Sequence, residues 1–236
     1  MLSLGPVKAS LRSPLLLPRV ALVDPDLLVG QPPATIAASG SDALSQLVEP
    51  FLSSRANPVT DALARDGIRR SARSLARAVA SGLDAAPDLR EDLALASLFG
   101  GLCLANSGLG AVHGFASVLG ARYAAPHGAL CAALLAPVVA ANLAALRERD
   151  PQNPVVARVG EVAALVTGRR GATAADASPW LAELCQTLQV PGLSSYGFVE
   201  ADVPEVLAQA RAASSMKANP IELTDAELSA ILRAAA

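Results

Sequence analysis

The chain has 236 residues, of which 52% are hydrophobic and 17% charged, and its mean hydropathy is +0.40. This composition excludes a disordered chain, which combines low hydrophobicity with high charge. The 19 basic and 21 acidic residues give a formal net charge of −2, without the basic surplus of a nucleic-acid-binding protein. Alanine makes up about a fifth of the chain and aromatic residues are few (four Phe, two Tyr, one Trp), which favours helices over strands.

The first 30 residues are predicted to contain short strands. These are expected over residues 7–11 and 19–23, and the second ends at Asp24-Pro25, a turn signal. Two strands alone do not make a stable sheet, so they are expected to belong to a larger one. We therefore interpret residues 1–30 as the end of an α/β domain and residues 31–236 as a complete all-helical domain.

The rest of the chain carries helical signals throughout. Helices are expected over residues 34–54, 61–81, 88–105, 110–120, 126–147, 154–167, 174–188 and 201–213, with a last one beginning at Thr224. Glu227, three residues after Thr224, completes a capping box that fixes this start. The predicted fold class is therefore mainly α, preceded by two short strands.

Two segments, residues 93–120 and 128–146, are apolar and long enough to cross a bilayer, which takes about 20 residues. Both are rich in Ala and Gly, are interrupted by Asn106, Pro137 and Asn142, and lack the Trp and Tyr belts of membrane helices. We interpret them as a buried hairpin, because a helix of a protein core is also apolar all round. A membrane hairpin is the alternative.

The three cysteines, Cys103, Cys131 and Cys185, are widely spaced and lie in apolar runs. They predict buried free thiols in a reducing compartment, and hence a cytoplasmic protein. A catalytic thiol is the alternative interpretation. Prolines and basic residues interrupt the apolar N-terminus, so no signal-peptide core is expected there.

The two histidines, His113 and His127, are the candidate functional residues. Both lie in the most apolar third of the chain, where a polar side chain needs a partner because burying it unpaired is costly. Asp42 and Gln46 are one helical turn apart and share a helix face. A site made of Asp42 and both histidines would suit a catalytic Fe(II) or Zn(II) ion with an open position. Two hydrogen-bonded core histidines are the alternative.

Several motifs occur in a fixed order along the chain. They are DPDL at 24–27, GSDAL at 40–44 followed by Glu49, GLGAVHG at 108–114, PHG at 126–128, LAPV at 135–138 before Asn142, and Asn219-Pro220 before the last helix. In these motifs the chain resembles the iron-containing alcohol dehydrogenase family. The second domain of that family has the helical fold shared with dehydroquinate synthase and glycerol dehydrogenase, and the resemblance covers essentially the whole chain.

The resemblance implies one divalent metal ion, usually iron, held by one Asp and three His. The Asp corresponds to Asp42, and two of the histidines correspond to His113 and His127. Gln46 stands where the third His is expected, and its carboxamide oxygen would be a weaker ligand than imidazole. A further His is expected four residues after His113, where this chain has Ser117, whose hydroxyl could relay a proton through water but is no base near neutral pH.

The resemblance also implies an N-terminal dinucleotide-binding domain with a Gly-rich phosphate loop. Most of that domain, with its phosphate loop, is expected to be missing from this chain. Only its end is expected, as residues 1–30, with Lys8 and Leu28 at positions that touch NAD or NADP. Gly108-Leu109-Gly110 follows a predicted helix instead of a strand, so it is interpreted as a close-packing turn and not as a phosphate loop.

The implied activity is metal-assisted hydride transfer between NAD(P) and a small alcohol, aldehyde or ketone. Neither a nucleic acid nor a membrane is expected as a partner, and the chain is expected to form a homodimer or to pair with a separate nucleotide-binding chain. Two alternatives stay open. One is a metal-binding remnant without redox activity, and the other is an enzyme like maleylacetate reductase with little metal dependence.

Overall fold

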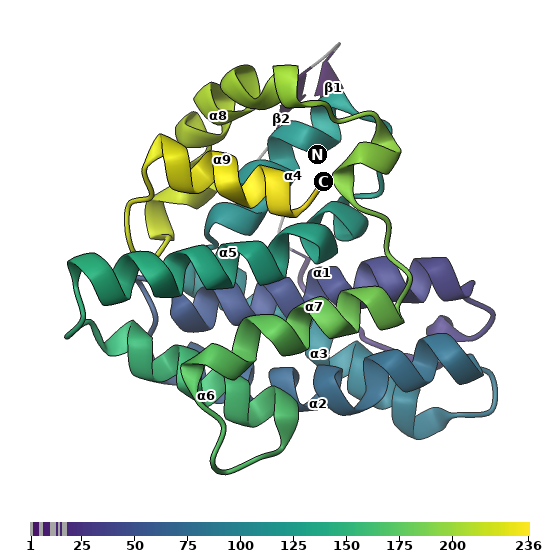
Figure 1. Cartoon of the computed structure of the whole chain (residues 1–236). Coiled ribbons are helices and arrows are strands. Elements are labelled where there is room, and N and C mark those ends of the chain that lie inside the picture. The colour runs from purple at the N-terminus through teal and green to yellow at the C-terminus, as the bar shows by residue number, and fades with distance from the viewer. Residues whose placement is uncertain (1, 5–6, 10–12, 14, 16–17) are drawn as a thin grey trace.

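The computed structural model describes residues 2–4, 7–9, 13, 15 and 18–236, with the backbone alone for 2–4 and 7–9. Within these ranges the chain is mainly helical, as the sequence predicts (Figure 1). Short connections join the helices. The position of each helix is set by the face that it buries against neighbouring helices.

A short antiparallel hairpin precedes the helices. β1 (Leu2–Leu4) pairs with β2 (Val7–Ala9), so the strand predicted over 7–11 forms over its first three residues, and its last two lie outside the described part. The strand predicted over 19–23 is wrong, because these residues are assigned no strand in the structure. Extended backbone becomes a strand only where a neighbouring chain supplies the ladder of hydrogen bonds.

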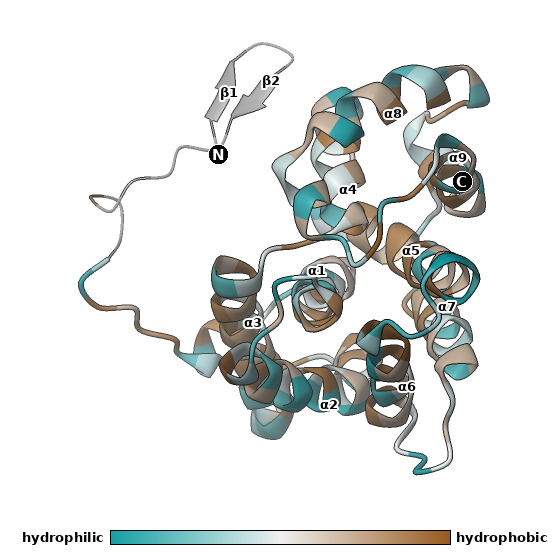
Figure 2. Ribbon diagram, turned by 90° about the vertical axis from the view of Figure 1, so that its left-hand side faces the viewer, coloured by the Kyte–Doolittle hydropathy of each residue, from teal (hydrophilic) through white to brown (hydrophobic). Residues whose placement is uncertain are grey.

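Three long helices pack on one another: α1 (Pro33–Leu52), α2 (Pro58–Ser81) and α3 (Pro87–Ser107). Figure 2 shows α1 nearly end-on at the centre, and α1 also contacts α5 and α6. α2 begins three residues before its predicted start, because the Asn57 side chain accepts hydrogen bonds from the N–H groups two and three residues further on. The central helix α1 therefore packs against four other helices, namely α2, α3, α5 and α6.

The next two helices are α4 (Ala111–Arg122) and α5 (His127–Arg149), which contact each other. In the described part of the chain, α5 is the single helix long and apolar enough to cross a membrane, and 72% of its most apolar stretch is buried inside the protein. α3 and α4 would pass the same test together, but the chain bends by 103° between them. Burial on nearly all sides explains why α5 has no polar face.

Four shorter helices complete the fold. α6 (Pro154–Thr167) packs on α2, α7 (Ala177–Thr187) and α9 (Asp225–Ala234) pack on α5, and α8 (Val203–Ala212) packs on α4. The predicted capping box at the start of α9 is confirmed by reciprocal hydrogen bonds between Thr224 and Glu227. Short 3-10 turns lie between the elements: η2 (Pro25–Leu28), η3 (Ala174–Asp176), η4 (Leu193–Tyr196), η5 (Glu200–Asp202) and η6 (Ser214–Ala218).

A glycine lets α5 begin against the backbone of α1. A Cβ atom on Gly128 would lie 2.0 Å from the carbonyl oxygen of Ala38, far inside the contact distance. Asp42 lies one helical turn after Ala38, and His127 directly precedes Gly128. The close approach of the two helices therefore brings His127 toward Asp42.

We expect Gly128→Ala to lower the free energy of unfolding by about 1–3 kcal/mol, because the added methyl group forces α1 and α5 apart. Gly101→Ala is the matched control, since a Cβ on Gly101 of α3 meets nothing within 4 Å. Alanine is favoured over glycine in a helix by about 0.5–1 kcal/mol, so this control is expected to be slightly stabilised. Urea denaturation compares the two variants, and a Gly128→Ala protein as stable as the wild type would contradict the packing argument.

Candidate metal centre

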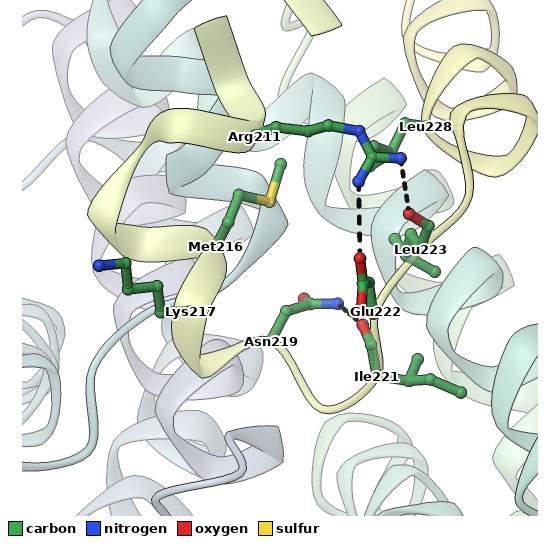
Figure 3. Close-up of a pocket in the computed structure, with 8 residues that line it drawn as sticks. All are labelled: Arg211, Met216, Lys217, Asn219, Ile221, Glu222, Leu223 and Leu228. Atoms are coloured by element: carbon green, nitrogen blue, oxygen red, sulfur yellow. Dashed lines mark hydrogen bonds and ion pairs between the residues drawn. The ribbon is translucent and has the colours of Figure 1, made fainter. Parts of the chain in front are cut away.

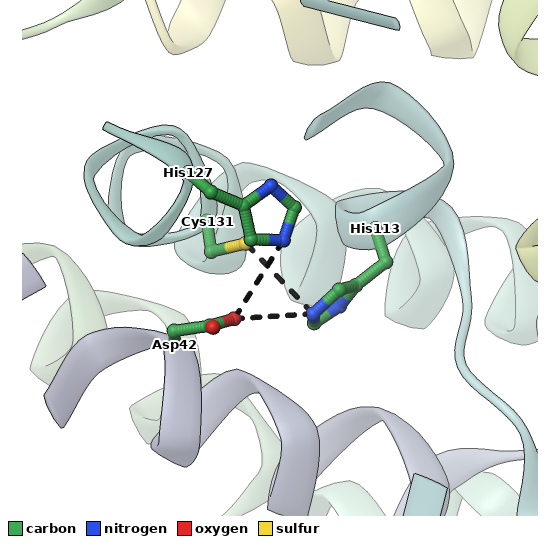
Figure 4. Close-up of side chains that lie close together, drawn as sticks. All are labelled: Asp42, His113, His127 and Cys131. Carbon is green, nitrogen blue, oxygen red and sulfur yellow. Dashed lines mark hydrogen bonds and ion pairs between the residues drawn. The ribbon is translucent and has the colours of Figure 1, made fainter. Parts of the chain in front are cut away.

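Three helices bring four possible metal ligands together. Asp42 comes from α1, His113 from α4, and His127 and Cys131 from the first two turns of α5. One donor atom from each of these side chains lies within 4.8 Å of all the others (Figure 4). The structure thus unites three of the four residues predicted as ligands and adds Cys131, which the sequence suggested only as a buried thiol.

The distances within this cluster are close to those around a bound ion. His113 Nε2 lies 3.2 Å from Asp42 Oδ1, and His127 Nε2 lies 3.9 Å from the same oxygen. Cys131 Sγ lies 3.7 Å from His127 Nε2 and 3.9 Å from His113 Nε2. Ligands bound tetrahedrally at 2.0–2.3 Å from zinc are about 3.3–3.6 Å apart, so small shifts suffice for binding. A carboxylate, two imidazoles and a thiol are also donors that divalent transition metals accept.

The electrostatics of the cluster favour a positive charge at its centre. Burial lowers the pKa of His113, but hydrogen bonds with Asp42, Cys131 and Glu49 outweigh this effect and raise the pKa well above its usual value. Burial raises the pKa of Asp42, and the two histidines more than compensate, so the net shift is downward. Two carboxylates around a buried imidazole therefore stabilise a cation there, either a proton or a metal ion.

Glu49 orients His113 from the side opposite to the cluster. Its Oε2 lies 2.6 Å from His113 Nδ1, and its Oε1 accepts a hydrogen bond of 2.7 Å from the N–H of Val112. A carboxylate only accepts, so Nδ1 carries the hydrogen and Nε2 is left facing Asp42 and Cys131. A carboxylate behind a histidine is the usual support of a metal ligand. The sequence showed Glu49 as part of a motif but not this role.

We expect Glu49→Gln to lower the affinity for Zn²⁺ by about 10–100-fold, because the ring of His113 loses its fixed orientation and part of its basicity. Competition with a chromophoric chelator measures this affinity. Glu91→Gln, at an exposed position of α3, is the matched control and is expected to bind like the wild type. Equal affinities for the two variants would contradict the role given to Glu49.

A network of amide groups holds the start of α4. Asn219 Oδ1 accepts a hydrogen bond of 3.2 Å from the N–H of Ala111, and Asn219 Nδ2 donates one of 2.7 Å to Asn142. A Cβ atom on Gly110 would lie 2.8 Å from Asn219 Oδ1 and 2.9 Å from Glu49 Oε1. Glycine at this position therefore lets both side chains reach the helix start that carries His113.

A cavity of about 310 Å³ lies between α8 and the segment that leads into α9 (Figure 3). Its Arg211 is engaged in ion pairs, since it lies 3.9 Å from Glu222 and 2.6 Å from Asp225. Met216 fills the side toward α4, where it packs on Gly114. The cavity lacks the converging donors of the cluster, so the candidate chemistry belongs to the cluster.

The other predicted site residues lie as follows. Gln46 is half-buried one turn after Asp42, and its Oε1 would lie 3.4 Å from a Cβ on Gly100 of α3. Ser117 is exposed one turn after His113, and its hydroxyl donates a 2.9 Å hydrogen bond to the carbonyl oxygen of Gly114. Ligation by Gln46 and proton relay by Ser117 stay predictions.

The predicted nucleotide contacts lie before α1. Leu28 is half-buried at the end of η2 and lines a cavity of about 310 Å³ together with Gln31, Gly40 and Leu93. Lys8 belongs to β2, and its side chain lies outside the described part. This cavity beside α1 therefore lies next to Leu28, which is predicted to contact the nucleotide.

The chain is similar to known dehydrogenases. Residues 36–236 match the profile of the Fe-containing alcohol dehydrogenase family, C-terminal part. The 1,3-propanediol dehydrogenase of Klebsiella pneumoniae is 38% identical over 93% of this chain and 55% of its own length. Alcohol dehydrogenase 4 of Schizosaccharomyces pombe is 36% identical over 93% of this chain and 50% of its own length. The chain spans about half the length of these curated relatives.

Solved structures show the same helical fold. A crystal structure of 1,3-propanediol oxidoreductase matches with a TM-score of 0.81 and 36% identity, over 90% of this chain and 54% of the other. Maleylacetate reductase from Rhizobium sp. strain MTP-10005 matches with a TM-score of 0.80 over 97% of this chain and 60% of the other, but at 24% identity this likeness shows the fold alone.

Proposed function

Because the chain belongs to the iron-containing alcohol dehydrogenase family, we propose that it is the metal-binding part of an NAD(P)-dependent alcohol dehydrogenase. The observation that carries the proposal is the convergence of Asp42, His113 and His127 on one point inside the helical fold. The proposed reaction is hydride transfer between the cofactor and a small alcohol, with an aldehyde or ketone as the oxidised form.

The metal ion and the side chains around it have different proposed roles. Fe(II), or Zn(II) in its place, would supply the positive charge that favours the deprotonated form of an alcohol. Asp42, His113 and His127 hold the ion, with Gln46 as the fourth ligand predicted from the resemblance. Ser117, exposed one turn beyond His113, is proposed to pass the alcohol proton toward solvent through water.

We propose that the nucleotide is held between this helical domain, residues 31–236, and a dinucleotide-binding domain that ends in residues 1–30. Supporting this, large apolar side chains before α1 are exposed, with Leu22 at 86% and Leu27 at 79%, as expected of a surface that another domain covers. Lys8 and Leu28 are the proposed contacts to NAD or NADP. For the assembly we propose a homodimer, with a complex between this chain and a separate nucleotide-binding chain as the alternative.

A cytoplasmic location is also proposed. Cys103, Cys131 and Cys185 are free thiols, as expected in a reducing compartment. No nucleic acid or membrane partner is proposed. The relatives are alcohol dehydrogenases, which favours the dehydrogenase over both a redox-inactive remnant and a reductase that works without metal.

Chelation tests the proposal. We expect the purified protein to contain close to one divalent ion per chain. Together with its nucleotide-binding domain it is expected to oxidise 1,3-propanediol with NAD⁺ or NADP⁺, and this reaction is expected to stop in EDTA and to return when Fe²⁺ or Zn²⁺ is added. A rate that is unchanged in EDTA would contradict the metal-dependent reaction. A protein that binds neither metal ion nor reduced nicotinamide cofactor would contradict the proposal as a whole.

A further inference from the structure

We propose that Cys131, and not Gln46, is the fourth ligand of the metal centre, and that its sulfur shifts the preference of the site from Fe(II) toward softer ions such as Zn(II). The inference rests on the proposed metal site and specifies its ligand set. The resemblance to the family does not predict it, because the resemblance places Gln46 in this role.

The geometry of α5 aims Cys131 at the cluster. His127 and Cys131 are four residues apart, so both project from the same face of the helix. Sγ lies 3.7 Å from His127 Nε2 and 3.9 Å from His113 Nε2, which are the two ring nitrogens nearest to Asp42 (Figure 4). The residue has no exposed surface, so its sulfur has no contact with solvent.

The other cysteines are placed differently. Cys103 is equally buried, but its Sγ donates a 3.3 Å hydrogen bond to the carbonyl oxygen of Thr60 in the α2–α3 contact. Cys185 is half-buried in α7. Among the three thiols, Cys131 is the one whose sulfur faces two imidazole nitrogens and a carboxylate. A thiol with a purely structural role would not need that position.

Gln46 also contacts a neighbouring helix. Its Cβ would lie 3.1 Å, and its Oε1 3.4 Å, from a Cβ on Gly100, so the side chain packs toward α3. A neutral amide oxygen also adds no charge to the site. The sulfur of Cys131, which lies within 4.8 Å of the other three donor atoms, therefore competes with this oxygen as a stronger donor.

Metal binding would convert the Cys131 thiol to a thiolate. The S–H proton leaves to solvent as the sulfur–metal bond forms, so one proton is released for each ion bound by this residue. The resulting set of one oxygen, two nitrogens and one sulfur is softer than the set of one oxygen and three nitrogens that the family resemblance implies. Soft thiolate ligands favour zinc over ions that prefer oxygen and imidazole.

Cobalt spectroscopy on the full chain tests the inference directly. A thiolate bound to Co²⁺ gives an intense sulfur-to-cobalt charge-transfer band in the near ultraviolet, which carboxylate, imidazole and amide ligands do not give. We expect this band in the wild type, in Gln46→Ala and in Cys103→Ser, and its loss in Cys131→Ser. Zn²⁺ affinity is expected to fall at least about tenfold in Cys131→Ser, since even outer-shell changes cost 10–100-fold.

X-ray absorption of the zinc-loaded wild type needs no variant and guards against a Cys131→Ser protein that fails to fold. One sulfur neighbour at about 2.3 Å is expected. Bound metal without a sulfur neighbour, or a charge-transfer band that survives in Cys131→Ser, would overturn the role of Cys131 and leave the metal site standing. A wild type that binds neither Co²⁺ nor Zn²⁺ would overturn both this inference and the proposed function.

Discussion

Replacement of Asp42 or His127 by alanine is expected to abolish metal retention. Each variant removes one of the four donor atoms that lie within 4.8 Å of one another. Asp42 also supplies negative charge next to both imidazoles, so its loss weakens the attraction for any cation. Elemental analysis of the purified proteins measures the effect as ions per chain.

The matched control is Asp88→Ala, which removes a carboxylate that is 66% exposed in the first turn of α3. Added Zn²⁺ is expected to raise the thermal stability of the wild type and of Asp88→Ala by about 2.7 kcal/mol at 100 times the dissociation constant, and to leave both site variants unchanged. Equal metal content in the wild type and in the two site variants would show that the ion is bound elsewhere.

Asp92→Asn is expected to destabilise the fold strongly. Asp92 is buried where α3 meets α2, and it accepts hydrogen bonds from Arg70 at 2.9 Å and from Arg73 at 2.5 and 2.6 Å. Ser74 donates a further bond of 2.5 Å. An asparagine keeps the shape but removes the carboxylate that Arg70 and Arg73 share, and only Arg70 keeps a close ion pair, with Asp66. This is expected to cost about 3 kcal/mol and to lower Tm by about 6–12 °C.

The lowered pKa of Asp92 determines how the stability difference between the wild type and Asp92→Asn depends on pH. Burial raises the pKa of Asp92, but the bonds and charges of Arg73, Ser74 and Arg70 outweigh it, so the pKa in the folded protein is lowered. The carboxylate therefore stabilises the fold above the pKa of the unfolded chain, and this contribution is lost as the pH falls through the folded pKa. The stability gap between wild type and Asp92→Asn should be constant above about pH 5 and narrow below about pH 4. A stability difference between the two proteins that does not change with pH down to acid unfolding would contradict this role of the Asp92 carboxylate.

Most of the fold follows from local signals in the sequence. The capping box of Thr224 and Glu227 fixes the start of α9, and the Gly168 stop fixes the end of α6, because these signals act within one turn. The start of α2 was predicted late because Asn57-Pro58 also signals a turn, although the same pair caps a helix. The segment 19–23 was predicted wrongly because its strand character depends on partners far away in the sequence or in another domain.

The site could be predicted only in part for the same reason. The resemblance suggested Asp42, His113 and His127, but the contact of Glu49 with His113 spans 64 positions and exists only because α1 and α4 both pack on α5. Cys131 did have a local signal, its spacing of four residues from His127. This spacing indicates a metal ligand only when the first turns of α5 are known to face Asp42.

Anomalous diffraction from crystals grown with Zn²⁺ or Co²⁺ is the most direct test of the central claim, which is that Asp42, His113 and His127 hold one divalent ion between α1, α4 and α5. The structure predicts a single strong anomalous peak within bonding distance of Asp42 Oδ1 and both Nε2 atoms. An anomalous peak at another place, or fully metal-loaded protein with no peak among these side chains, would contradict the claim.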